Sequence, residues 1–174
     1  MLSHSTGWLR IAVALATYAG LRCGEVRALE VQDVDLQTDL LRVRRAFAEN
    51  EVLTPKSGHE RVVPIASELR SILVEAVRAK LPRARVVPNE RGHTPTRQAV
   101  LTALKRMQER HELRTRSFHS LRRAFCSGLF RGGASVAAVR LLAGHSDLAT
   151  TQRCVHASAG DLAAAVAKLR VTSG

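Results

Sequence analysis

The chain has 174 residues, enough for one domain with its own core, and carries 27 lysine and arginine residues against 15 acidic ones, a net charge of +12. It has no apolar run long enough to cross a membrane and no start typical of a signal peptide, and its three cysteines form no close pairs. These features favour a cytoplasmic, soluble protein and argue against a membrane-spanning or disulfide-rich secreted one.

The surplus of positive charge is mostly arginine, which suits polyanion binding because guanidinium groups form paired hydrogen bonds with phosphate. Composition alone does not separate DNA from RNA. Aromatic residues make up only 3% of the chain, which disfavours a single-strand binder that stacks bases on aromatic side chains. We therefore expect double-stranded DNA, contacted along its backbone, as the partner.

The first half of the chain combines helical and strand patterns. Ser5 or Thr6 can cap a first helix through about Tyr18 with an apolar side, and a second short helix is predicted over 24–30. Three β-rich runs follow, separated by polar or glycine-containing turns: 40–45, 51–54 and 61–65. These runs predict a small three-stranded antiparallel sheet.

The second half is predicted to be helical. Ser67 caps a helix to about Lys80, and the proline-containing stretch 82–95 is a predicted loop. Further helices are expected over 96–112, 117–131, 134–143, 147–155 and 161–170. The predicted fold class is therefore α+β, a mostly helical domain with a small three-stranded antiparallel sheet near its N-terminal half.

Five short motifs occur between about residue 8 and residue 157. Residues 19–25 read Ala-Gly-Leu-Arg-Cys-Gly-Glu, and residues 54–64 read Thr-Pro-Lys-Ser-Gly-His-Glu-Arg-Val-Val-Pro. Residues 119–122 read His-Ser-Leu-Arg, residues 141–146 read Leu-Leu-Ala-Gly-His-Ser, and residues 150–156 read Thr-Thr-Gln-Arg-Cys-Val-His. In order and spacing, the five motifs resemble those of the catalytic domain of the tyrosine recombinases, the phage-type integrases and their relatives.

The resemblance implies a site-specific recombinase domain that cleaves and rejoins DNA strands through a 3′-phosphotyrosyl link, without a metal or cofactor. It implies that Arg22 and Arg122 clamp the non-bridging oxygens of the phosphate and that Lys56 protonates the leaving 5′ oxygen. His119 and His145 are implied to assist in proton transfer and phosphate binding. His119 also lies three residues before Arg122, so the two share one helical face.

Cys154 stands at the nucleophile position, where the family pattern has tyrosine. Cysteine is a competent nucleophile in other proteins, and Arg153 and His156 beside it would favour the thiolate. Its sulfur, however, falls about 4 Å short of where a phenol oxygen would lie, and a misplacement of about 1 Å can cost ~100-fold in rate. The only tyrosine, Tyr18, lies in the predicted first helix. We therefore expect the chain to be deficient in cleavage.

Several alternatives remain open at this stage. Cys154 is either an engineered block or a product of natural decay, and a zinc site would draw on His145, Cys154 and His156 without completing a familiar four-ligand pattern. The chain could also act only as a DNA-binding protein, or as a basic helical regulator unrelated to recombination.

Domain organisation and assembly follow from the same resemblance. The first motif leaves no room for the N-terminal core-binding domain of the family, so we expect a single catalytic domain over 1–174, either truncated or a gene remnant. The amphipathic segment 161–170 would fold back on its own domain in the free protein, or pack into a neighbouring copy as a homo-oligomer on DNA.

Overall fold

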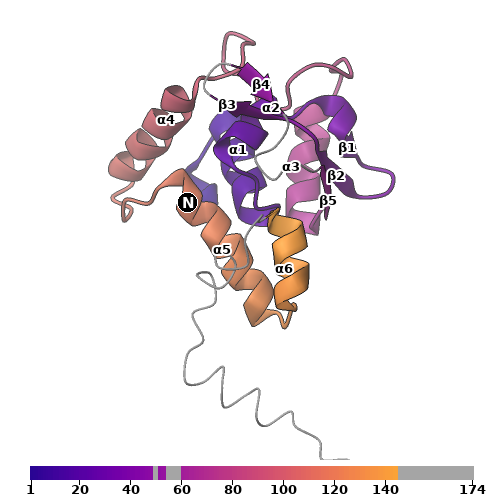
Figure 1. Cartoon of the computed structure of the whole chain (residues 1–174). Helices are drawn as coiled ribbons and strands as arrows, with labels where there is room; N and C mark the ends of the chain where they lie inside the picture. Colours follow the sequence, from indigo (N-terminus) through magenta and orange to yellow (C-terminus); the bar gives the residue numbers. More distant parts are fainter. Residues whose placement is uncertain (49–50, 54–59, 145–174) are drawn as a thin grey trace, which may run out of the picture.

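The structure, a computed structural model, describes residues 1–48, 51–53 and 60–144, and these form a mostly helical α+β fold (Figure 1). The elements are η1 (Leu2–His4), α1 (Gly7–Tyr18), α2 (Cys23–Ala28), η2 (Val31–Asp33), β1 (Val34–Asp35), β2 (Leu40–Val43), β3 (Ala46–Ala48), β4 (Glu51–Leu53), β5 (Arg61–Pro64), α3 (Ser67–Val77), α4 (Arg97–Arg110), α5 (Phe118–Arg131) and α6 (Val136–Ala143). In this described part of the chain, no helix has the length and apolar character needed to cross a membrane.

Helix α1 is the centre of the core. It begins after Thr6 and ends at Tyr18, as the sequence predicts. The predicted apolar side extends around the whole helix over residues 12–16, which are all fully buried. A helical stretch that is apolar all round must be covered all round, and α1 is in contact with α2, α3, α4 and α5.

The three-stranded antiparallel sheet has the order β1-β2-β5. Its central pairing sets Leu41 of β2 opposite Val63 of β5, and both side chains are buried. Their neighbours Arg42 and Val62, also opposite each other, are exposed. Because side chains alternate between the faces of a strand, this register places one apolar face of the sheet on the core.

The predicted membership of this sheet is wrong for one strand. The run predicted over 51–54 forms β4, which pairs with β3 in a separate two-stranded sheet, and β1 takes its place in the three-stranded one. All three residues of β4 are exposed, so it has no side chain to place in the core. Instead, β3 packs against α2, where the Phe47 ring lies under the guanidinium groups of Arg27, 4.6 Å away, and Arg85, 5.4 Å away.

Three capped helices complete the described part. The side chains of Thr96, Ser117 and Ser135 each accept a backbone hydrogen bond at the start of α4, α5 and α6. Helix α3 has Ser67 as its first residue and Ala66 at its N-cap, without a side-chain cap, so the predicted Ser67 cap is wrong; the helix ends at Val77 rather than near Lys80. Helix α6 packs against α5 in Figure 1 and ends at Gly144, whose φ of 63° is left-handed. The helices predicted over 147–155 and 161–170 lie outside the described residues.

Candidate functional site

Three of the predicted site residues line one cavity. Arg22, His119 and Arg122 border a space of about 1100 Å³ between α2, the β3–β4 hairpin and the starts of α4 and α5. Residues that are 97 positions apart in the sequence therefore face the same space. The other three predicted site residues, Lys56, His145 and Cys154, lie outside the described residues, as does His156, the remaining candidate zinc ligand.

Arg122 borders this cavity and is buried, with only 1% of its surface exposed. Its guanidinium group donates to the carbonyl oxygen of Gly20 at 2.5 Å and to that of Ala143. Its Nε has no hydrogen-bond partner among the described residues. Burial, together with the positive charge of Arg22, lowers the pKa of Arg122 to about 10. Because burial and the charge of Arg22 disfavour the charged form of Arg122, a bound anion would stabilise that form.

The turn that supplies one of these carbonyls requires glycine. Gly20 has a φ of 64°, and a Cβ atom there would lie 2.4 Å from Cδ1 of Phe125. A side chain at this position would therefore be strained and would also collide with α5, the helix that carries Arg122. This explains the first glycine of the 19–25 motif.

Arg22 stands at the start of α2, half-buried at the edge of the same cavity. Its Nη1 donates to Oε1 of Glu25 at 3.0 Å, and its Nη2 donates to the carbonyl oxygen of Gly144 at 2.9 Å. The backbone N–H of Arg22 donates to Oε2 of Glu25 at 2.7 Å, which caps the helix. Glu25, the last residue of the 19–25 motif, thus orients Arg22 of the same motif.

Glu25 and Arg61 form the centre of the cluster, although neither was predicted as a site residue. Glu25 is 1% exposed, and Arg61 binds it through two hydrogen bonds of 2.8 and 2.7 Å. Arg122 Nη1 lies 4.0 Å from the same carboxylate. Burial by itself would raise the pKa of Glu25, but the hydrogen bonds and charges of Arg61 and Arg22 hold it below its ordinary value. The signal in the sequence was that both residues belong to the motifs, Glu25 at the end of 19–25 and Arg61 within 54–64.

The C-terminal end of α6 binds all three arginines. The carbonyl oxygens of three successive residues, 142 to 144, accept hydrogen bonds from Arg61 Nε at 3.0 Å, from Arg122 Nη2 and from Arg22 Nη2 respectively. The last carbonyls of a helix lack partners within the helix and carry its negative dipole end, so cations stabilise them. Three guanidinium groups share one carboxylate here. The cluster therefore keeps a surplus of positive charge that suits a phosphate-sized anion.

His119 lies at the exposed rim of the cavity, one turn before Arg122 on α5. Burial, and then the positive charges of the neighbouring arginines, lower the pKa of His119. The imidazole is therefore neutral at pH 7 and can donate or accept one proton. A phosphate oxygen bound to the arginines would lie close to a group that is able to exchange a proton.

The two described cysteines differ in their surroundings. Cys126 is fully buried in the α5–α6 cluster. Cys23 is half-buried, packs against the edge of the main core and also lines the cavity. Burial raises the pKa of the Cys23 thiol, although Arg27 and Arg97 partly oppose the shift.

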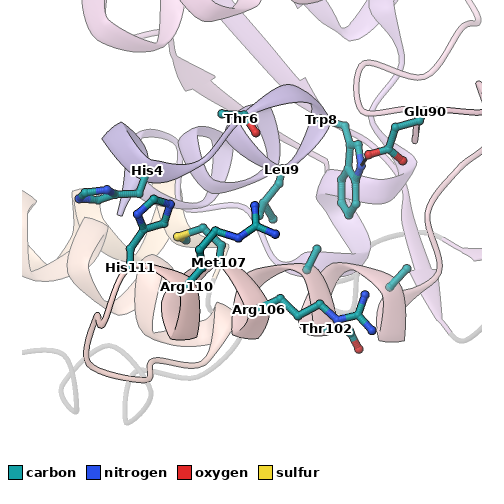
Figure 2. A pocket seen from close by; sticks show the side chains of 12 residues that line it. His4, Thr6, Trp8, Leu9, Glu90, Thr102, Arg106, Met107, Arg110 and His111 are labelled. Carbon is teal, nitrogen blue, oxygen red and sulfur yellow. Dashed lines mark hydrogen bonds between the residues drawn. The ribbon is translucent and has the colours of Figure 1, made fainter.

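A second cavity, of about 460 Å³, lies between the start of α1 and helix α4. Figure 2 shows Trp8 turned toward Glu90, and its indole N–H donates to that carboxylate at 2.7 Å. The rings of His4 and His111 lie 4.6 Å apart at the other end. None of the motif residues lines this space. The cluster around Arg122 is therefore the stronger candidate site.

The fold and the cluster together define an α+β domain with a cationic cleft, and comparisons with known proteins place it in a family. The phage integrase family matches residues 2–160, so the chain belongs to the phage integrase family. The tyrosine recombinase XerD of Corynebacterium glutamicum is 34% identical over 164 residues, which are 88% of this chain and 49% of that protein. The chain thus spans about half the length of such relatives.

Solved structures share the fold. An integrase of the Tn1549 transposon, determined in complex with a circular intermediate DNA, superimposes with a TM-score of 0.80 at 19% identity and covers 92% of this chain and 58% of that one. The catalytic domain of bacteriophage HP1 integrase has a TM-score of 0.61 at 21% identity and covers 91% and 80% of the two chains. The predicted fold class is therefore confirmed, as is the predicted family.

Proposed function

We propose that this chain is the DNA-binding catalytic domain of a site-specific tyrosine recombinase, in which Arg22, Arg122 and His119 surround one phosphodiester of duplex DNA. The observation that carries the proposal is the shared cavity, in which two anchored guanidinium groups and a neutral imidazole face the same space. Family membership adds a second, independent support. The transposon integrase with the same fold was determined with DNA, which agrees with DNA as the partner here.

Each proposed residue has a chemical task that its surroundings suit. Two arginines neutralise the charge that builds on the non-bridging oxygens, and their fixed anchors mean that little reorganisation is needed during the reaction. Neutral His119 is able to transfer a proton at the same phosphate. We assign proton donation to the leaving 5′ oxygen to Lys56 and a second phosphate contact to His145, from their motif positions alone.

The nucleophile position carries the second part of the proposal. Because Cys154 occupies it, we propose that the chain binds DNA but is deficient in forming the covalent 3′ link. The thiol sulfur would fall about 4 Å short of the position that a phenol oxygen would occupy. The relatives are bacterial proteins, and bacterial DNA lies in the cytoplasm, so we expect the chain to act there.

The decisive experiment is covalent trapping on nicked suicide duplexes that carry candidate attachment sites. The parent chain is compared with Cys154→Tyr, and Cys154→Phe is the matched control that restores ring size without a hydroxyl group. We expect a covalent adduct with Cys154→Tyr alone. An adduct with the parent chain would show that the thiol is a working nucleophile. No adduct with any chain on a duplex that all three bind would contradict the catalytic assignment.

A second function, DNA binding without catalysis, is favoured by one observation. The cysteine removes the nucleophile, yet the net charge of +12 is retained. Residues 97–131 alone contain nine arginine and lysine residues and two glutamates. Competition binding between cognate and unrelated duplexes tests this function. A preference for the cognate site supports occupancy of recombination sites, and equal affinity for every duplex contradicts it.

Sedimentation with and without DNA tests whether 161–170 joins neighbouring copies, and a monomer in both states contradicts that proposal.

A further inference from the structure

Arg61 joins three parts of the fold that are distant in the sequence. It is the first residue of β5, it binds Glu25 of α2 across 36 residues, and it binds the carbonyl oxygen of Leu142 in α6 across 81 residues. All three of its nitrogen atoms take part in these contacts. Its side chain is 7% exposed, and Arg61 is not among the residues that line the cavity. This arginine therefore faces the protein rather than a bound phosphate.

Arg61 also lies directly against the end of α6. A Cβ atom built on Gly144 would be 2.9 Å from Nη1 of Arg61 and 3.0 Å from its Cδ. The α6 terminus can approach this closely only because residue 144 is glycine, which also adopts the left-handed φ of 63° without strain. Arg61 thus sets how near the end of α6 comes to the Glu25 carboxylate.

The two arginines of the site depend on these same anchors. Arg22 is bound between Glu25 and the Gly144 carbonyl, and Arg122 between the Gly20 and Ala143 carbonyls beside Glu25. If the carboxylate and the α6 end moved apart, neither arginine could keep all its contacts. Planar, two-pronged binding of a carboxylate with a third bond from Nε is a geometry that lysine cannot reproduce.

We propose that Arg61 is a positioning residue: by linking Glu25 to the C-terminal end of α6, it holds the guanidinium groups of Arg22 and Arg122 in the orientation that binds the phosphate. This proposal rests on the proposed function. The rival explanation is that Arg61 only stabilises the fold. The two differ in what a change at Arg61 does to the other arginines, because a purely stabilising residue leaves them unaffected in the folded protein.

The test uses the whole chain with ¹⁵N-labelled arginine side chains and follows the Nη–H signals of Arg22 and Arg122, the groups that donate to Glu25 and to the backbone carbonyls. Arg61→Lys keeps the charge but not the geometry. The matched control is Arg70→Lys, because Arg70 also pairs with a carboxylate, that of Asp39 at 2.8 Å, but lies outside the cavity and is exposed. We expect faster hydrogen exchange at the Nη–H groups of both arginines in Arg61→Lys and no change in Arg70→Lys. Unchanged exchange in folded Arg61→Lys would overturn the proposal, whatever happens to its melting temperature.

Inorganic phosphate separates this proposal from the proposed function. Phosphate should shift the Nη–H signals of Arg22 and Arg122 in the parent chain and bind about tenfold more weakly to Arg61→Lys, a difference of about 1.4 kcal/mol. If phosphate shifts neither signal in the parent, the proposed function fails, and the exchange rates still decide the role of Arg61. Should Arg61→Lys not fold, Gly144→Ala disturbs the same contact from α6, and the same exchange result is expected.

In the Cys154→Tyr chain, the rate of covalent trapping provides a further test of the role of Arg61. We expect Arg61→Lys to slow covalent trapping by about 10- to 100-fold, since small misplacements of catalytic groups have effects of this size. Duplex affinity should fall by no more than the tenfold expected for free phosphate, because the other backbone contacts of a duplex do not depend on Arg61. A loss of affinity well beyond tenfold would overturn the positioning role and point to general loss of structure.

Discussion

Replacement of Glu25 with glutamine removes the one carboxylate that three guanidinium groups share. The side chain is 1% exposed and accepts two hydrogen bonds from Arg61, one from the Arg22 side chain and one from the Arg22 backbone. Breaking a buried ion pair by removing one partner costs about 3–5 kcal/mol. Glutamine keeps the volume and one acceptor oxygen, so we expect a loss near the lower value, about 3 kcal/mol.

Urea unfolding at neutral pH measures this loss as a lower midpoint with an unchanged slope. For a chain of this length, a loss of this size lowers the melting temperature by about 6–12 °C. Asp39→Asn is the matched control, because it neutralises a carboxylate paired with Arg70 at 2.8 Å that is 48% exposed. Exposed pairs contribute only about 0–1 kcal/mol. A Glu25→Gln variant as stable as Asp39→Asn would refute the reasoning.

The pH dependence supplies an independent check. Because the folded pKa of Glu25 lies below its ordinary value, the carboxylate stabilises the protein above the ordinary carboxyl pKa. That contribution is lost as the pH falls through the lowered folded pKa. The difference in free energy of unfolding between the parent and Glu25→Gln should therefore be largest at neutral pH and should shrink in acid.

Phosphate should restore part of the stability of Glu25→Gln, by about 2.7 kcal/mol at 100 times its dissociation constant.

Three further predictions concern packing, proton affinity and salt. Gly24→Ala should destabilise the chain by about 1–3 kcal/mol, because its Cβ would lie 2.4 Å from the carbonyl oxygen of Phe47. Gly128→Ala, within α5 and with no atom near its Cβ, should instead stabilise it by about 0.5–1 kcal/mol. In urea titrations, equal effects would contradict the packing argument. Nuclear magnetic resonance should give His119 a pKa below that of an exposed histidine, since burial and then the surrounding arginines disfavour its charged form, and inorganic phosphate should raise it. Duplex affinity should fall steeply with salt, by a logarithmic slope of about −0.9 for each phosphate contacted, and a flat response would exclude backbone recognition.

Local sequence signals predicted those elements whose ends are marked by capping residues or glycine. The first helix begins after Thr6, α5 begins after Ser117 and α6 ends at Gly144. At α5 the side chain of Ser117, and at α6 the left-handed Gly144, mark the end of the helix, and this information lies within a few residues. The motifs likewise identified Arg22, His119 and Arg122, which the fold brings to one cavity.

Tertiary structure decided what depends on distant partners. The run at 51–54 has strand propensity, but only the choice of neighbour separates the β3–β4 hairpin from the three-stranded sheet. The number of covered sides of α1 depends on the four helices that pack on it. The roles of Glu25 and Arg61 arise because α2, β5 and the end of α6 meet. The partners of Arg61 could not be predicted from the sequence, because they lie 36 and 81 residues away and leave no local pattern. The sequence by itself thus determined the family and the arginines of its motifs, whereas the shared carboxylate and carbonyls that orient them were decided by packing.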